Sequence, residues 1–165
     1  MVTEPVQDSA AVAVAPLVRP LVPNDLDALT PLDEAYAAAV GAEAHVNRGS
    51  LHFFGRSGHS FVAESADGSP LGFVLAHSTW TGGLPALRLE RLVAAPGDDA
   101  ADTAAALAEA VVKSAYDAGV YRLNAEVPTV DDVGLTALTR AGFVQRDVVA
   151  FGRRLGSAGT SGTRA

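Results

Sequence analysis

The stretch "RLVAAPGDDAADTAAAL", Arg91 to Leu107, decides the fold of this chain. Its first residues are largely apolar, its middle turns at Pro96-Gly97, and its end is rich in alanine. The pattern predicts a strand, a tight turn and the start of a helix. In many proteins such a junction is rich in glycine and basic residues and binds a phosphate. Here the turn carries Asp98, Asp99 and Asp102 instead, so an anion site and a simply capped helix are the two interpretations to separate.

The helix that begins in this stretch is predicted to run from Asp99 to Ala118. Apolar residues recur along it at helical spacing, and Gly119 is typical of the position just after a helix. The apolar run at 86–95 precedes it as a strand, and "YRLNAEV", 121–127, follows it with strand-like alternation. Strand, helix and strand therefore form a β-α-β unit, in which we expect a right-handed crossover and two parallel strands.

The sequence before this unit predicts antiparallel strands. Turn residues at Asp67-Gly68 separate two apolar runs, which indicates a hairpin. Pro20 suits an edge strand, and Pro31 is expected to split the first helix in two. The remaining predicted elements are strands at 17–22, 60–64, 71–78 and 143–155, and helices at 26–39, 43–51 and 131–141. The fold class is thus mixed α/β, with a mostly antiparallel central sheet flanked by helices.

Length and composition fit one domain with one core, since 48% of the 165 residues are hydrophobic. The boundaries expected from composition are a flexible arm at 1–15, a single domain at 16–156 and a disordered tail at 157–165.

Charge and cysteine content exclude several classes of function. The formal net charge is -7 and no basic cluster is present, which argues against a nucleic-acid partner. Without cysteine the chain has no disulfide and no thiolate metal site, and the spacing of its histidines indicates no metal site either. No apolar run reaches the roughly 20 residues of a membrane span, and the N-terminus lacks the basic segment of a signal peptide. We therefore expect no membrane partner and a cytoplasmic location.

Four stretches in this order resemble the GNAT superfamily of N-acetyltransferases. They are "LVRPLVPNDLDAL", "FVAESADGSPLGFVLA", "LERLVAAP" leading into the long helix, and "LTALTRAGFV" near the end. The resemblance covers about residues 17–155. It implies a sheet that splays after the fourth strand, with acetyl-CoA as cosubstrate in the splay. The acyl arm would then lie along the backbone of Leu92, Val93 and Ala94.

The loop that binds the pyrophosphate of CoA in this superfamily departs from its pattern here. Its basic residue falls on Asp99, and its glycines fall on Ala100, Asp102 and Ala104. An aspartate facing a diphosphate repels it by about 1 kcal/mol in water and by more when desolvated. The alternative is structural, since Asp98 or Asp99 suits the N-cap and Asp102 suits the first turn of a helix. A Mg²⁺ ion held by these aspartates is a further alternative.

The resemblance also assigns candidate chemistry to single residues. Glu90 matches the position at which several members keep a general base, acting directly or through water. The alternative is a strand carboxylate paired with Arg88 or Arg91. The tyrosine that often protonates the leaving thiolate falls on Leu138, which cannot donate a proton.

Two further polar groups are interpreted from the residues alone. Glu126, on the strand after the long helix, is expected to be solvated. His52 and His59 flank "FFGRSG", which is interpreted as a loop that could line a substrate pocket, whereas His77 in a strand is more typical of a structural residue.

Two functions follow as alternatives. One is a GNAT-like N-acyltransferase that moves an acyl group from acetyl-CoA to a small-molecule or peptide amine. The other is a non-catalytic module of the same fold that binds a small molecule or a protein, with a homodimer through the sheet edge as one form.

Overall fold

The computed structural model describes residues 15–80 and 82–151. The predicted tail at 157–165 and all but the last residue of the predicted arm lie outside this part of the chain.

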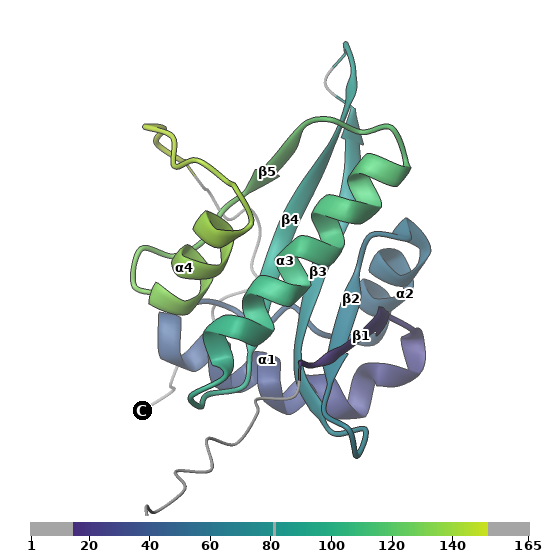
Figure 1. Cartoon of the computed structure of the whole chain (residues 1–165), viewed down its shortest axis with the longest axis vertical. Helices are drawn as coiled ribbons and strands as arrows, with labels where there is room; N and C mark the ends of the chain where they lie inside the picture. Colours follow the sequence, from purple (N-terminus) through teal and green to yellow (C-terminus); the bar gives the residue numbers. More distant parts are fainter. Residues whose placement is uncertain (1–14, 81, 152–165) are drawn as a thin grey trace, which may run out of the picture.

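A five-stranded mixed sheet forms the centre of the molecule (Figure 1). Its strands follow one another in sequence order: β1 (Leu17–Pro20), β2 (Phe61–Glu64), β3 (Pro70–Trp80), β4 (Pro85–Ala94) and β5 (Leu123–Ala125). The pairs β1–β2, β2–β3 and β3–β4 are antiparallel, and β5 is parallel to β4. The predicted fold class and the β-α-β unit are therefore confirmed.

Helices cover both faces of the sheet (Figure 1). They are the 3₁₀ turn η1 (Pro23–Asp25) and the α-helices α1 (Leu26–Val40), α2 (Arg48–Ser57), α3 (Ala100–Asp117) and α4 (Asp132–Arg140). On the face of α3 and α4 the sheet buries Val74, Leu89 and Leu107 among others. On the face of α1 and α2 it buries Leu29, Leu51 and Phe73. The sheet thus separates two apolar cores rather than one.

The first helices differ from the prediction at two points. Pro31 lies inside α1 and does not split it, because Leu29, Asp33 and Ala37 on either side are all held on the buried face. The second helix begins at Arg48 and not near residue 43. Its start is set by Asn47, whose side chain accepts from Ser50 N at 3.0 Å while Ser50 Oγ accepts from Asn47 N at 2.9 Å.

The predicted strand at 143–155 is not formed in its described part, because residues 143–151 have no regular structure. The helix before it ends at Gly142 with φ 81°, and Val144, Val148, Val149 and Phe151 are exposed. β5 is only three residues long, so it offers little edge for a further strand to pair with. Residues 152–155 lie outside the described part.

Candidate active site

The sheet splays between β4 and β5, as the resemblance implies. The two strands pair over Leu87–Leu123, Arg88–Asn124 and Leu89–Ala125 and no further, although β4 continues to Ala94. Leu92, Val93 and Ala94 therefore run beyond their parallel neighbour and have no β5 residue opposite them. On the α3 side, Leu92 lies in one apolar cluster with Val127 and Leu138. In the splay, the backbone of β4 therefore has no β5 partner and lies beside an apolar cluster.

A bulge in β4 sets the position of Glu90. Leu75 of β3 pairs with Arg91, while the next residue, Ala76, pairs with Leu89, so Glu90 is the extra residue. A bulge re-aims the side chain that it inserts. The Glu90 carboxylate turns toward β3, where its Oε1 lies 3.0 Å from His77 Nε2, and the same oxygen forms an ion pair with Arg88, whose Nε lies 2.8 Å away.

These contacts place Glu90 in a chain of polar groups that runs from His77 of β3 through Arg88 to Glu126, one residue beyond β5. Arg88 also binds Glu126 Oε2 at 3.0 Å, and the Glu126 side chain is 63% exposed. Glu90 therefore does pair with Arg88, and Glu126 is solvated, as the structural alternatives predict. Arg91, the other predicted partner of Glu90, points elsewhere. Oε2 of Glu90 has no hydrogen-bond partner among the described residues, so one carboxylate oxygen stays available.

His77 connects Glu90 to a cavity of about 500 Å³ between α2 and β3. The Nδ1 atom of His77 lies 3.1 Å from the carbonyl oxygen of Ser78, and Nε2 faces Glu90. A carbonyl and a carboxylate both accept hydrogen bonds, so both contacts are satisfied only while the ring carries two protons. A ring with one proton can satisfy one of them at a time. His77 is therefore a polar group at the cavity wall with a carboxylate directly behind it.

The predicted pocket loop is in fact part of α2. His52, Phe53, Arg56 and Ser57 of that helix line the cavity together with His77 and Ser78 of β3. His52 is thus at the pocket, as predicted, whereas His59 is not. His59 is buried, with Nδ1 2.7 Å from Ser114 Oγ of α3, and burial lowers its pKa.

Beneath the splay, Arg91 and Asp33 form a buried ion pair with Nε 2.9 Å from Oδ1. The two atoms are misaligned for a hydrogen bond, so the contact is chiefly ionic. Asp33 Oδ2 also accepts from the backbone N–H groups of His45 and Val46, and the Arg91 guanidinium donates to the carbonyl of Glu43. The pair therefore holds the segment between α1 and α2 against β4.

Tyr36 extends this network to α4. Its ring lies 5.0 Å from the Arg91 guanidinium, and its hydroxyl donates to Asp131 Oδ2 at 2.7 Å. Burial and the Asp131 carboxylate raise the pKa of the Tyr36 phenol. The other oxygen of Asp131 accepts from Gly134 N at 2.9 Å and so caps α4. Helices on opposite faces of the sheet are tied together across the splay in this way.

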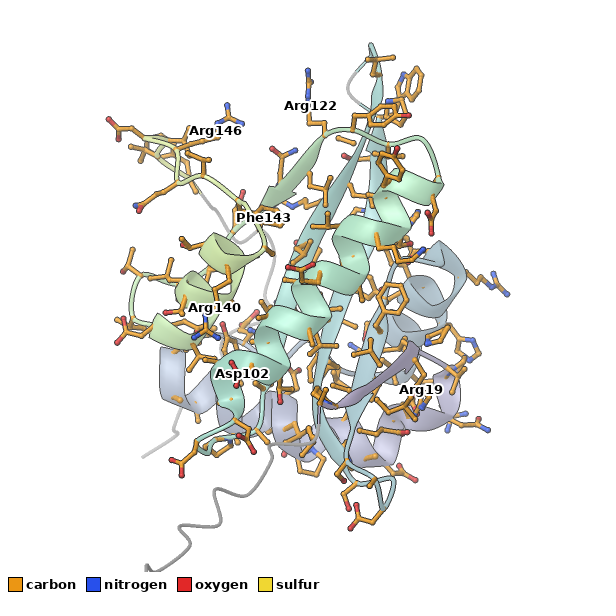
Figure 2. The ribbon with its side chains drawn as sticks, in the orientation of Figure 1. Arg19, Asp102, Arg122, Arg140, Phe143 and Arg146 are labelled. Carbon is orange, nitrogen blue, oxygen red and sulfur yellow. The ribbon has the colours of Figure 1, made fainter. Side chains whose placement is uncertain are left out.

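The start of α3 carries the aspartates of the opening stretch. Asp99 occupies the N-cap, as predicted, but its side chain makes no capping hydrogen bond. The Asp99 carbonyl accepts from Thr103 N at 2.9 Å instead. Asp102 lies in the first turn, as predicted, and its Oδ1 accepts from Arg140 Nη1 of α4 at 2.6 Å. Figure 2 shows these two side chains meeting between the helices.

The other residues of the predicted loop are buried or apolar. Ala100 is 8% exposed and Ala104 is 1% exposed, and Ala104 belongs to the apolar cluster between the sheet and α3. Leu138, at the position of the absent tyrosine, is 8% exposed and belongs to the same cluster. The sequence analysis missed Arg140 and undervalued His77. Neither carried a local signal, since each acquires its partner only through the tertiary fold.

Solved structures with similar folds define the class of the protein. The chain superimposes on a ribosomal-protein-alanine N-acetyltransferase from Brucella melitensis at a TM-score of 0.63 and 20% identity, covering 86% of this chain and 100% of that one. It superimposes on an aminoglycoside N-acetyltransferase, AAC(6')-Iy in complex with CoA, at 0.65 and 20%, covering 84% and 94%. With the splayed sheet, these likenesses define a GNAT fold.

The family to which the chain belongs is a narrower group than the proteins that share this fold. A family model described as "Protein of unknown function (DUF1999)" matches residues 18–160, so the chain belongs to that family. The wild-type protein TTHA1254 of Thermus thermophilus is 35% identical, with a TM-score of 0.71 over 86% of this chain and 98% of that one. No curated protein matches the chain. Among the helices that the structure describes, none combines the length and apolar character needed to cross a membrane.

Proposed function

We propose that this protein is an N-acyltransferase that moves the acyl group of acetyl-CoA, or of another acyl-CoA, to an amine. The observation that carries the proposal is the combination of the splay with the bulge beside it. The bulge turns Glu90 toward His77, and His77 lines the cavity. An acyl arm along Leu92, Val93 and Ala94 and an amine in the cavity would then lie on the two sides of Glu90.

In this reaction the amine loses a proton and attacks the thioester carbonyl. The new C–N bond forms, the C–S bond breaks, and the thiolate leaves with a proton from solvent, because Leu138 cannot supply one. Glu90 would accept the proton of the amine directly, through water or by way of His77. The Oε2 atom has no hydrogen-bond partner among the described residues and is available for this role, and the contacts of Oε1 with His77 and Arg88 orient the carboxylate.

The residues at the start of α3 fit a diphosphate only in part. Asp99 and Asp102 bring negative charge to the place where CoA phosphates lie in the GNAT pattern, but Arg140 brings one positive charge to the same turn. Acetyl-CoA would therefore bind with Arg140 as the compensating cation. A cytoplasmic location is part of this proposal, because acetyl-CoA is a cytoplasmic metabolite.

The second candidate is a non-catalytic module of the same fold. It is favoured by the Asp102–Arg140 ion pair, in which the cation at the expected phosphate position already has a carboxylate partner, and by Leu138 in place of a proton donor. Such a module would bind a small molecule or a protein, and a homodimer would form through an edge of the sheet.

Calorimetric titration with acetyl-CoA, with and without Mg²⁺, separates the two. The enzyme requires saturable binding of acetyl-CoA. If no heat is detected at high ligand concentration under both conditions, the enzyme is excluded and the non-catalytic module is the function that remains. Given binding, Glu90→Gln should lower the rate of amine acetylation at neutral pH by about 10²-fold or more. Glu126→Gln is the matched control, because it removes an exposed carboxylate from the same arginine. Equal loss in both variants would remove Glu90 from the mechanism.

A further inference from the structure

One face of α2 opens onto the cavity between that helix and β3. The residues that form it recur at the i, i+3, i+4 and i+7 spacing of a single helical face. They are Gly49, His52, Phe53 and Arg56. The opposite face buries Leu51 and Phe54 in the core. The cavity face is therefore an exposed and chemically mixed surface on a helix that the core holds firmly in place.

The charge on this face is positive. Arg56 has no ion-pair partner among the described residues, and no Asp or Glu of the described chain lines the cavity. The Glu90 carboxylate contacts His77 of the cavity wall and forms an ion pair with Arg88 as well. Because Arg56 is in the last turn of α2, the helix dipole stabilises it there without an acidic partner. The guanidinium is thus available to an anion that enters the cavity.

The remaining surface of the cavity suits a flat apolar group. Phe53 lines the cavity, and its side chain is 56% exposed. Its ring meets the rings of His77 and Phe54 edge-on, with centroids 5.3 Å and 5.0 Å apart. An aromatic ligand could add a further stacked or edge-on contact to this group of rings. The volume of about 500 Å³ fits a small molecule rather than a folded partner.

From these contacts we propose that the acceptor is a small amine that also carries a carboxylate and a flat apolar side chain. The carboxylate binds Arg56, the apolar group packs on Phe53, and the amine points toward His77 and Glu90. Aromatic amino acids are the simplest compounds of this class. The inference rests on the proposed function for the fate of the amine, but the binding itself does not require an acyl donor. A polycationic amine is disfavoured, since it would meet Arg56 with like charge.

Calorimetry on the full chain without acetyl-CoA tests the binding. L-phenylalanine should bind the wild-type protein, and L-phenylalaninamide, which lacks the carboxylate charge, should bind about tenfold more weakly. Arg56→Gln should weaken L-phenylalanine by about the same factor and abolish the difference between the two ligands. Arg48→Gln is the matched control, because it removes the same charge from the first turn of α2 outside the cavity lining. Its affinities should equal those of the wild type.

Equal affinity of acid and amide for the wild-type protein, no binding of either, or a full-affinity Arg56→Gln variant would each overturn the inference. A separate acetylation assay keeps the proposed function distinguishable. Binding that depends on Arg56 without acetylation of the bound amine would defeat the proposed function and leave the cavity assignment standing. Acetylation of other amines, with no binding of ligands that carry a carboxylate, would support the proposed function and overturn the cavity assignment.

Discussion

Arg140 on α4 and Asp102 on α3 form an ion pair, with Nη1 2.6 Å from Oδ1, over the turn in which a CoA phosphate would be expected. The two side chains are 51% and 66% exposed, so the pair adds at most about 1 kcal/mol to stability. Its larger effect is on local charge. Arg140 offsets part of the charge of Asp102, the aspartate that would repel a phosphate at this turn.

Asp102→Asn should therefore tighten acetyl-CoA binding, because it removes the repulsion and releases Arg140 toward the phosphates. An electrostatic change of about 1 kcal/mol corresponds to roughly fivefold in affinity. Arg140→Gln should weaken binding by a similar factor. Titration calorimetry at low salt measures both, and thermal unfolding of each variant serves as the control for stability. If both variants bind as the wild type does, the phosphates lie elsewhere or do not bind.

The buried pair of Asp33 and Arg91 should behave quite differently from a surface pair. Asp33→Leu or Arg91→Met alone leaves an uncompensated buried charge, which costs about 3–5 kcal/mol. The double variant should be clearly more stable than the sum of the two single losses predicts. Urea unfolding measures all three. Lys113→Ala is the control, since it breaks an exposed pair with Asp117 and should cost about 1 kcal/mol or less.

Contacts local in sequence were the part of the fold that could be predicted. The helix at 100–117 has one apolar stripe and ends before Gly119, and the hairpin turns at Gly68, where φ is 82°. Patterns of this kind depend on neighbouring residues alone. The start of α2 was misplaced because its signal is a reciprocal cap between Asn47 and Ser50, without the usual glutamate or glutamine.

The sequence predicted single residues of the candidate site, but not the contacts between residues that the tertiary fold brings together. Glu90 was identified by its place in the strand, but its partner His77 could not be, since the bulge between Leu75 and Ala76 shifts the register that joins them. Arg140 meets Asp102 across 38 residues of sequence. The cavity face of α2 follows from helical spacing once the helix is known, so it was lost with the interpretation of that segment as a loop.

The position of Gly72 in β3 requires glycine, because the backbone of β4 lies too close for a Cβ atom. A Cβ atom at this position would lie 2.4 Å from the carbonyl oxygen of Val93, and backbone cannot move aside as a flexible side chain does. Gly72→Ala should therefore lower the free energy of unfolding by about 1–3 kcal/mol, as overpacking does.

Gly55→Ala in α2 is the matched control. Its Cβ would meet its nearest neighbour at 3.6 Å, an ordinary contact, so helix propensity should dominate and stability should hold or rise. Urea unfolding that ranks the two variants the other way would contradict the assignment of Gly72.

His59 should make the stability of the protein depend on pH. Burial lowers its pKa in the folded state below the ordinary value of 6.5, so the unfolded chain takes up a proton first as the pH falls. Stability from the neutral imidazole is therefore complete above pH 6.5 and is lost as the pH falls from 6.5 toward the lower folded pKa. In His59→Gln this loss should be smaller, because the position no longer titrates. Urea unfolding at several pH values on both sides of 6.5 measures the slope.

Ser114→Ala is the control, because it removes the partner of Nδ1 but keeps the imidazole, so it should lower stability and retain the slope. A His59→Gln slope as steep as that of the wild type would assign the acid sensitivity to other groups.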